Sequence, residues 1–148
     1  MEDFERPLNE RGEKDAPRMG KQLHKQDAQP DLICSSPARR AMSTAKIISE
    51  ILAYPLNSIQ SARELYHAGP DEILRVVQSF RDTRTCAMIV GHNPGLTDFV
   101  NDLCDEDIMN IPTAGVVRVQ LQTDSWKRVT WKGGKLMLFD YPKKNQKG

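Results

Sequence analysis

The sequence predicts an α/β domain of three layers, α/β/α, in which helices flank a mixed and mostly parallel central sheet. Two observations carry this prediction. In the earlier part of the chain, short apolar runs that are typical of buried strands alternate with helical patterns. In the later part, residues 116–121 alternate apolar and polar side chains, as antiparallel strands do, and further strand-like segments follow them.

The first predicted helix covers residues 8–26, with Asn9 as its N-cap and apolar side chains at helical spacing. Pro17 lies inside this helix, although proline removes an internal hydrogen bond. Three further helices are predicted to cover residues 38–53, to begin at Pro70 and to begin at Pro94. The predicted strands are 32–34, 59–62, 86–90, 116–121, part of 129–131, and 136–139.

Length and composition indicate a single globular domain over residues 1–142, followed by a polar tail over residues 143–148. The 148 residues are 39% hydrophobic and 28% charged, which is ordinary for a soluble protein. The formal net charge is only +1, and this argues against a dedicated nucleic-acid-binding protein. The longest apolar runs, such as residues 86–90, are far shorter than a membrane span of about 20 residues.

The N-terminus and the cysteines favour a cytoplasmic protein. The chain starts Met1-Glu2-Asp3, which is acidic where a signal peptide is basic and then apolar. Cys34, Cys86 and Cys104 lie far apart and form no CxxC pair. We therefore expect three reduced thiols inside the core, with no disulfide and no metal site.

Polar, turn-forming residues follow two of the predicted buried strands, and each such segment leads directly into a helix. The first segment is 35–40 and the second is 91–95. Ligands of open α/β sheets bind beyond the carboxyl ends of the strands, and a helix N-terminus favours an anion. Arg40 is able to bind a phosphate with two parallel hydrogen bonds, or else it is simply solvated. His92 is either a phosphate or acid–base residue or a hydrogen-bonded structural histidine. We expect their side chains to lie within about 8 Å of each other, so that one phosphate spans them.

The remaining candidates give weaker signals. His24 and His67 do not follow a predicted strand, and we interpret both as structural or solvated. Ser35 and Ser36 lack the Gly-x-Ser-x-Gly pattern of a serine nucleophile. The sequence contains neither metal-ligand spacing nor a glycine-rich dinucleotide loop, so no metal and no other cofactor is predicted.

Two motifs and four supporting stretches resemble a known family. The motifs are Ser35-Ser36-Pro37-x-x-Arg40-x-x-x-Thr44-Ala45 and Val90-Gly91-His92-Asn93-Pro94. The supporting stretches are Glu5-Arg6-Pro7-Leu8-Asn9-x-x-Gly12, Glu64-Leu65-Tyr66, Asn110-Ile111-Pro112-Thr113 and Phe139-Asp140-Tyr141-Pro142-Lys143-Lys144. In order and over nearly the whole chain, they resemble the histidine phosphatase superfamily, with its phosphoglycerate-mutase-like fold. The details are most similar to its small bacterial branch, the SixA-type phosphohistidine phosphatases.

The resemblance implies a reaction and a set of site residues. The family forms a phosphohistidine intermediate without a metal or other cofactor, and its SixA-type branch acts on phosphohistidine. Carried over to this chain, Arg40 is a catalytic and phosphate-binding arginine, and His92 is the second histidine. Asn93 and Arg6 are expected as phosphate-binding neighbours, whereas Glu64 is not assigned as a general acid. The expected partner is a phosphorylated protein or a small phosphorylated substrate, and no particular oligomeric state is predicted.

The chain departs from the family in one respect. The family begins with a central strand that ends in Arg-His-Gly or Arg-His-Ala, where the histidine is the nucleophile. This sequence contains no Arg-His pair. We therefore expect the first strand to be missing, its neighbours to be left with unpaired edges, and the chain as given to be nearly inactive. The alternative is a non-catalytic remnant that binds phosphate or a phosphoprotein.

Overall fold

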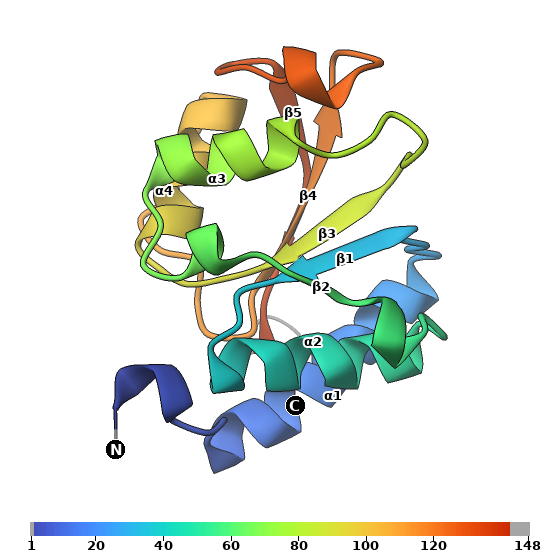
Figure 1. Cartoon of the computed structure of the whole chain (residues 1–148), viewed down its shortest axis with the longest axis vertical. Coiled ribbons are helices and arrows are strands. Elements are labelled where there is room, and N and C mark those ends of the chain that lie inside the picture. Colours follow the sequence, from blue (N-terminus) through green and yellow to red (C-terminus); the bar gives the residue numbers. More distant parts are fainter. Residues whose placement is uncertain (1, 143–148) are drawn as a thin grey trace. The chain divides into compact units, whose positions relative to one another are not determined.

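The computed structural model describes residues 2–142, and the predicted polar tail, 143–148, lies outside the described residues (Figure 1). The chain has an α/β fold with four α-helices and five strands in its described part, which confirms the predicted fold class. It divides into two compact units. The first holds the residues up to Tyr66 together with Arg84–Gly91, and the second holds His67–Thr83 together with the residues from His92 onward. A single domain over residues 1–142 stays a prediction.

The first unit is a parallel sheet with two helices. The helices are α1 (Glu10–Lys25) and α2 (Arg39–Ile51), and the strands are β1 (Leu32–Ser35), β2 (Gln60–Ser61) and β3 (Ala87–Val90). The strands are ordered β2-β1-β3, and both pairings are parallel. In Figure 1, α2 lies against one face of this sheet and α1 lies beside α2. Because all three strands run the same way, their carboxyl ends lie at one edge.

Helix α1 forms where the sequence predicts it. The side chain of Asn9 accepts a hydrogen bond from the backbone N–H of Gly12 at 2.8 Å, so the predicted N-cap is confirmed. The apolar stripe of α1 is buried, with Met19 only 1% exposed. Gly20 allows α1 to approach α2 closely, because a Cβ at this position would lie 2.8 Å from Cδ1 of Ile51.

The central strand of the parallel sheet, β1, is more deeply buried than the outer strand β3. All four residues of β1 are buried, as a strand between two neighbours should be. All four residues of β3, Ala87–Val90, are apolar, yet each is only partly buried. Among the described residues, β3 pairs only with β1, so it forms an edge of its sheet.

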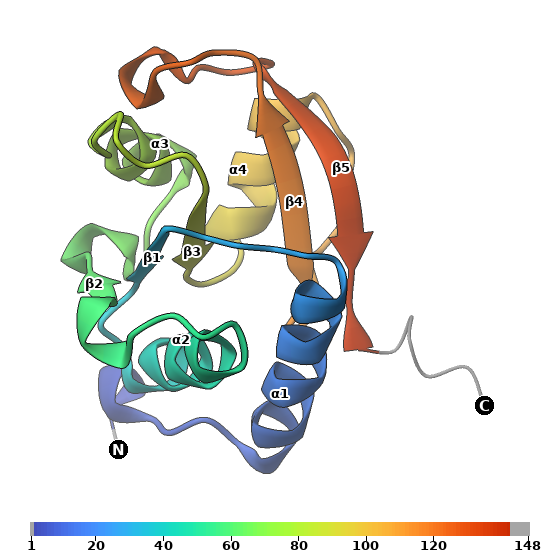
Figure 2. The ribbon, with the colours of Figure 1, turned by 90° about the vertical axis from the view of Figure 1, so that its right-hand side faces the viewer.

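The second unit combines two helices with an antiparallel pair of strands. The helices are α3 (Pro70–Gln78) and α4 (Gly95–Cys104), and the strands are β4 (Val116–Leu121) and β5 (Gly134–Asp140). Helix α3 packs against α4, and α4 packs against β5 (Figure 2). The predicted mixed arrangement is thus realised as two pairing groups, one parallel and one antiparallel, in the described chain. None of its helices has the length and apolarity needed to cross a membrane.

Two local predictions are wrong. Residues 129–131 form no strand: a 3₁₀ helix, η4 (Trp126–Arg128), precedes them, and the carbonyl of Val129 accepts a hydrogen bond from the side chain of Gln78 at 2.8 Å instead of from a partner strand. Cys86 is exposed rather than in the core, because it lies in the loop that precedes β3. Cys34 and Cys104 are buried free thiols, as expected.

Candidate functional site

The candidate site lies at the carboxyl edge of the parallel sheet. Ser35 is in register with Ser61 of β2 and with Val90 of β3. Just beyond this edge, the backbone N–H of Ser36 donates to the carbonyl of Val90 at 2.9 Å, so the ends of β1 and β3 stay together. The segments that lead to Arg40, to Tyr66 and to Gly91 therefore all start from one edge, where ligands of open α/β sheets bind.

Arg40 lies in the first turn of α2. The N-cap of α2 is Ala38, whose side chain has no oxygen to cap the helix. The backbone N–H of Ala38 donates to Oγ of Ser36 at 3.2 Å. The first-turn amides and the positive end of the helix dipole favour an anion here. A cationic side chain is disfavoured at this end of a helix unless a negative group faces it.

Asp3 supplies that negative group. Nη1 of Arg40 donates to the backbone carbonyl of Asp3 at 2.7 Å, and Nη2 donates to Oδ2 of Asp3 at 3.2 Å. The arginine side chain is 28% exposed and the aspartate side chain 42%. Asp3 belongs to a short 3₁₀ helix, η1 (Asp3–Glu5), which packs against α2. The arginine that the sequence predicts as a phosphate ligand is thus held by a segment 37 residues away.

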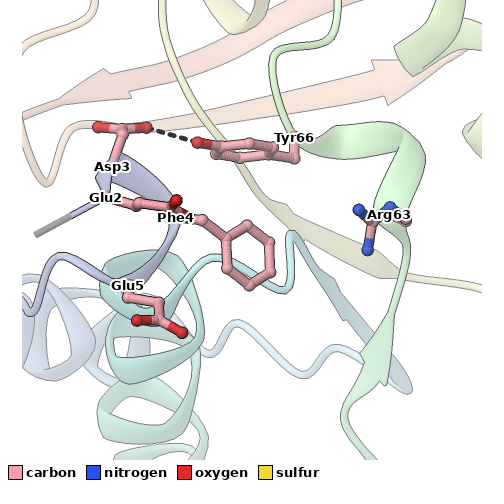
Figure 3. A pocket seen from close by; sticks show the side chains of 6 residues that line it. All are labelled: Glu2, Asp3, Phe4, Glu5, Arg63 and Tyr66. Carbon is pink, nitrogen blue, oxygen red and sulfur yellow. Dashed lines mark hydrogen bonds between the residues drawn. The ribbon is translucent and has the colours of Figure 1, made fainter.

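Tyr66 also binds Asp3 (Figure 3), so that Asp3, Arg40 and Tyr66 form one cluster. It follows the 3₁₀ helix η3 (Arg63–Leu65), and its hydroxyl donates to Oδ2 of Asp3 at 2.7 Å. The Phe4 ring meets the Tyr66 ring edge-on, with centroids 5.1 Å apart. The Tyr66 hydrogen bond, helped by Arg40, lowers the pKa of the Asp3 carboxyl and keeps it ionised. The same bond raises the pKa of the Tyr66 phenol.

A shallow pocket of roughly 350 Å³ shares these residues. Its lining comes from η1 and the residue before it, and from the first residue of η3 and the residue after it, with side chains of mixed charge and two aromatic rings (Figure 3). The lining residues are Glu2, Asp3, Phe4, Glu5, Arg63 and Tyr66. The part of the chain that the structure describes holds no cluster of histidine, cysteine, aspartate or glutamate arranged to bind a metal ion.

Arg6 and Glu64 also belong to the first unit. Arg6 follows η1, is exposed, and contributes to the lowered pKa of Asp3 through its positive charge. Its phosphate-binding role stays a prediction. Glu64 is exposed, and it acts on Cys34: burial first, and then the Glu64 charge, raise the pKa of that thiol to about 11.

His92 and Asn93 begin the second chain segment of the second unit. The backbone carbonyl of His92 accepts from Leu96 N–H at 3.1 Å at the start of α4. Oδ1 of Asn93 accepts from the hydroxyl of Thr97 at 2.8 Å, and its Nδ2 donates to the carbonyl of Ile111 at 2.6 Å. Both ends of the Asn93 amide are therefore engaged within this unit. Phosphate binding by His92 and Asn93, and the short separation between His92 and Arg40, stay predictions.

The sequence does not predict Asp3 as a site residue, and Tyr66 belongs only to the supporting stretch Glu64-Leu65-Tyr66. The two residues are 63 positions apart, so no local spacing links them to each other or to Arg40. His24 and His67 are both exposed, and their interpretation as structural or solvated residues stays a prediction.

Residues 3–74 match the family model of the histidine phosphatase superfamily, branch 1. The predicted resemblance to this superfamily is confirmed. Helices α1 and α2, the strands β1 and β2 and the Asp3–Arg40–Tyr66 cluster all lie within the matched segment. No curated protein matches the chain in sequence.

Solved structures share the histidine phosphatase fold with this chain. A protein assigned as phosphohistidine phosphatase SixA from Nakamurella multipartitia superposes with a TM-score of 0.81 at 21% identity, over 96% of this chain and 88% of its own. The protein histidine phosphatase SixA complexed with tungstate gives 0.81 at 20% identity, over 97% and 88%. A protein assigned as SixA from Agrobacterium tumefaciens gives 0.80 at 24%, over 96% and 87%. The predicted phosphoglycerate-mutase-like architecture is thereby confirmed.

Proposed function

We propose that this chain is a phosphatase domain of the phosphohistidine type, which binds the phosphoryl group of a phosphohistidine side chain on a partner protein. The observation that carries the proposal is the position of Arg40, held in the first turn of α2 at the carboxyl edge of the parallel sheet. A guanidinium and free helix amides together suit a phosphoryl group. One of the structures that shares the fold is a protein histidine phosphatase complexed with tungstate, which is a tetrahedral oxyanion like phosphate.

His92 supplies the second donor in this proposal. It follows β3, whose end is bonded to the end of β1 through Ser36 and Val90. During the reaction, a neutral histidine nitrogen attacks phosphorus, and the bond between phosphorus and the substrate nitrogen breaks. Arg40 and His92 neutralise the negative charge on the equatorial oxygens as this exchange proceeds. Water then hydrolyses the phosphohistidine intermediate and releases phosphate.

The nucleophile is the part of the reaction that these 148 residues do not supply. None of the three histidines follows an arginine. We propose that a further strand, ending in Arg-His, pairs with the edge of β3. The partial exposure of the apolar residues 87–90 supports this, because strands of parallel sheets are normally buried and β3 has a partner strand on one side only among the described residues. The bacterial and cytoplasmic setting expected from the sequence belongs to the same proposal.

A second candidate function follows from the same observations. Without the nucleophile, the chain binds phosphate or a phosphohistidine protein through Arg40 and His92 but does not turn it over. Two observations favour this function for the 148-residue chain by itself: among the described residues β3 pairs with β1 only, and the sequence contains no Arg-His pair.

The experiment compares the 148-residue chain with a variant extended at its N-terminus by an apolar strand ending in Arg-His. The substrate is a histidine phosphotransfer protein phosphorylated with phosphoramidate, and released phosphate is measured. We expect hydrolysis only with the extended chain, and a loss of at least about 100-fold when Arg40→Ala removes a charge-stabilising donor from it. Arg39→Ala, at the exposed neighbouring position, is the matched control and retains the activity.

Two results would contradict the proposal. If the 148-residue chain hydrolyses the substrate at an enzymatic rate and His92→Ala abolishes this, then His92 is the nucleophile and no further strand is needed. If the extended chain folds but Arg40→Ala leaves its rate unchanged, Arg40 is not a phosphate ligand and the proposed site is wrong.

A further inference from the structure

We infer that Asp3 and Tyr66 are positioning residues for Arg40, which fix the direction in which its guanidinium faces the phosphoryl group. The inference rests on the proposed function, because it assigns a task to the residues behind the proposed phosphate ligand. The role inferred for Asp3 and Tyr66 is exerted through Arg40, because Asp3 binds Arg40 and Tyr66 binds Asp3.

The geometry of the Asp3 contact carries the first step. Two acceptors of a single residue, the backbone carbonyl and Oδ2 of Asp3, take hydrogen bonds from two different nitrogens of Arg40, at 2.7 and 3.2 Å. Two such bonds define both the position and the plane of a guanidinium, whereas one bond leaves it free to rotate. Arginine has five N–H donors in that plane, so fixing two of them fixes the directions of the other three.

Tyr66 fixes the position of the Asp3 carboxylate, which accepts the hydrogen bond from Arg40. Its hydroxyl donates at 2.7 Å to Oδ2, the same oxygen of Asp3 that accepts from Arg40. The ring of Tyr66 is held by the edge of Phe4, and Leu65 beside it in the chain is only 2% exposed. The half-exposed carboxylate of Asp3 is thus connected through Tyr66 to the buried Leu65 of the first unit.

The charge of the Asp3 carboxylate and its positioning of Arg40 have opposite effects on anion binding, and this makes the inference testable. The negative carboxylate of Asp3 by itself repels a phosphoryl group, whereas a well-oriented Arg40 attracts one. Removing the Tyr66 hydroxyl changes no formal charge. Tyr66→Phe therefore reports the positioning effect with little contribution from the charge effect.

The experiment is a titration of the full 148-residue chain with sulfate, followed by NMR of the backbone amides near the start of α2. We expect Tyr66→Phe to weaken sulfate binding about three- to tenfold, in line with the loss of one hydrogen bond to a charged group. In the Arg40→Ala background, the same substitution has no effect, because the group that it positions is gone. Tyr54→Phe, which removes an exposed hydroxyl bonded to the Ser58 carbonyl at 3.0 Å, is the matched control and leaves the affinity unchanged.

A second variant keeps the test decisive if Tyr66→Phe does not fold. Phe4→Leu lies in η1, outside the core, and removes the ring contact that holds Tyr66. We expect it to weaken sulfate binding about twofold, again only when Arg40 is present. Unchanged or tighter binding in the folded neutral variants overturns the inference, since the carboxylate would then merely oppose the anion.

Failure of the inference and failure of the proposed function give different results. If Arg40→Ala weakens sulfate binding but Tyr66→Phe and Phe4→Leu do not, the phosphate site stands and the positioning role is wrong. If Arg40→Ala itself has no effect, or sulfate does not bind, the proposed site fails and the positioning role fails with it.

Discussion

The side-chain amide of Asn93 donates to the carbonyl of Ile111 at 2.6 Å, and this bond connects the residue after His92 to the loop that precedes β4. The other end of the same amide accepts from the backbone N–H and the hydroxyl of Thr97, in the first turn of α4. A single side chain thus joins a strand-to-helix segment to a distant loop within the second unit.

We expect Asn93→Ala to lower the free energy of unfolding by about 1–3 kcal/mol, because it leaves a carbonyl and an N–H without their partners. Urea unfolding measures this loss. Asn110→Ala is the matched control: its contact with Asn93 is longer, 3.3 Å, and exposed, so its effect should be smaller. Equal stability of Asn93→Ala and the parent chain would show that the amide does not tie these segments together.

Gly95 allows the start of α4 to approach the backbone of Ala68 closely. A Cβ at this position would collide with the backbone carbonyl oxygen of Ala68. Gly95→Ala should therefore displace the start of α4 and cost about 1–3 kcal/mol or more. At Gly69 the nearest atom is the Oε1 of Glu72, at 3.6 Å, so Gly69→Ala serves as the control in the same unfolding measurement. The prediction fails if the two variants are equally stable.

The Asp3 carboxylate makes a pH-dependent contribution to stability. The Tyr66 hydrogen bond and Arg40 lower its pKa in the folded state. The stabilisation is therefore fully present above the unfolded value of about 3.9 and is lost as the pH falls through the lower folded value. We expect the stability difference between the parent chain and Asp3→Asn to be constant between about pH 7 and 5 and to shrink below pH 4.

Chemical unfolding of the parent chain and of Asp3→Asn over this pH range tests whether the stability difference shrinks as the pH falls. Asp107→Asn, at an exposed loop position, is the control and should show no comparable trend. A difference between parent and Asp3→Asn that grows as the pH falls would contradict the assignment of an ionised, hydrogen-bonded Asp3.

The three thiols should react at very different rates. Cys86 is exposed, whereas Cys34 and Cys104 are buried. Burial raises the pKa of both buried thiols, that of Cys34 to about 11, so both form less thiolate at a given pH than an ordinary exposed thiol does. We expect iodoacetamide at pH 8 to modify one cysteine per native chain, identified as Cys86 by peptide mass spectrometry, and all three in urea. Rapid labelling of Cys34 in the native chain would contradict its placement.

The expected convergence of Arg40 and His92 is open to direct measurement. If one anion spans both side chains, sulfate shifts the ring resonances of His92 in the parent chain and shifts them much less in Arg40→Ala. Affinity should be no tighter than roughly millimolar, which corresponds to about 4 kcal/mol. Arg39→Ala is the control. Equal shifts of the His92 resonances in the parent chain and in Arg40→Ala would show that Arg40 and His92 do not bind the same anion.

The sequence predicted those features that local patterns encode. Asn9 caps α1 and Pro70 opens α3, because capping and proline geometry depend on neighbouring residues. The Asp3–Arg40–Tyr66 cluster could not be predicted in this way, since its members come from three distant segments. At Val129 the local pattern predicts a strand that does not form. The side chain of Gln78, from α3, donates to the Val129 carbonyl that would otherwise bind a partner strand.

The open edge of β3 has a practical consequence. Within the described residues its outer backbone groups meet no other strand, so they are suited to bind a separate peptide by strand addition. If that peptide carries the Arg-His pair, nucleophile and phosphate site come from two different molecules. Catalysis then becomes a bimolecular property, which rises with peptide concentration and disappears on dilution. The chain would behave as one half of a split enzyme, and its turnover would report the presence of the other half.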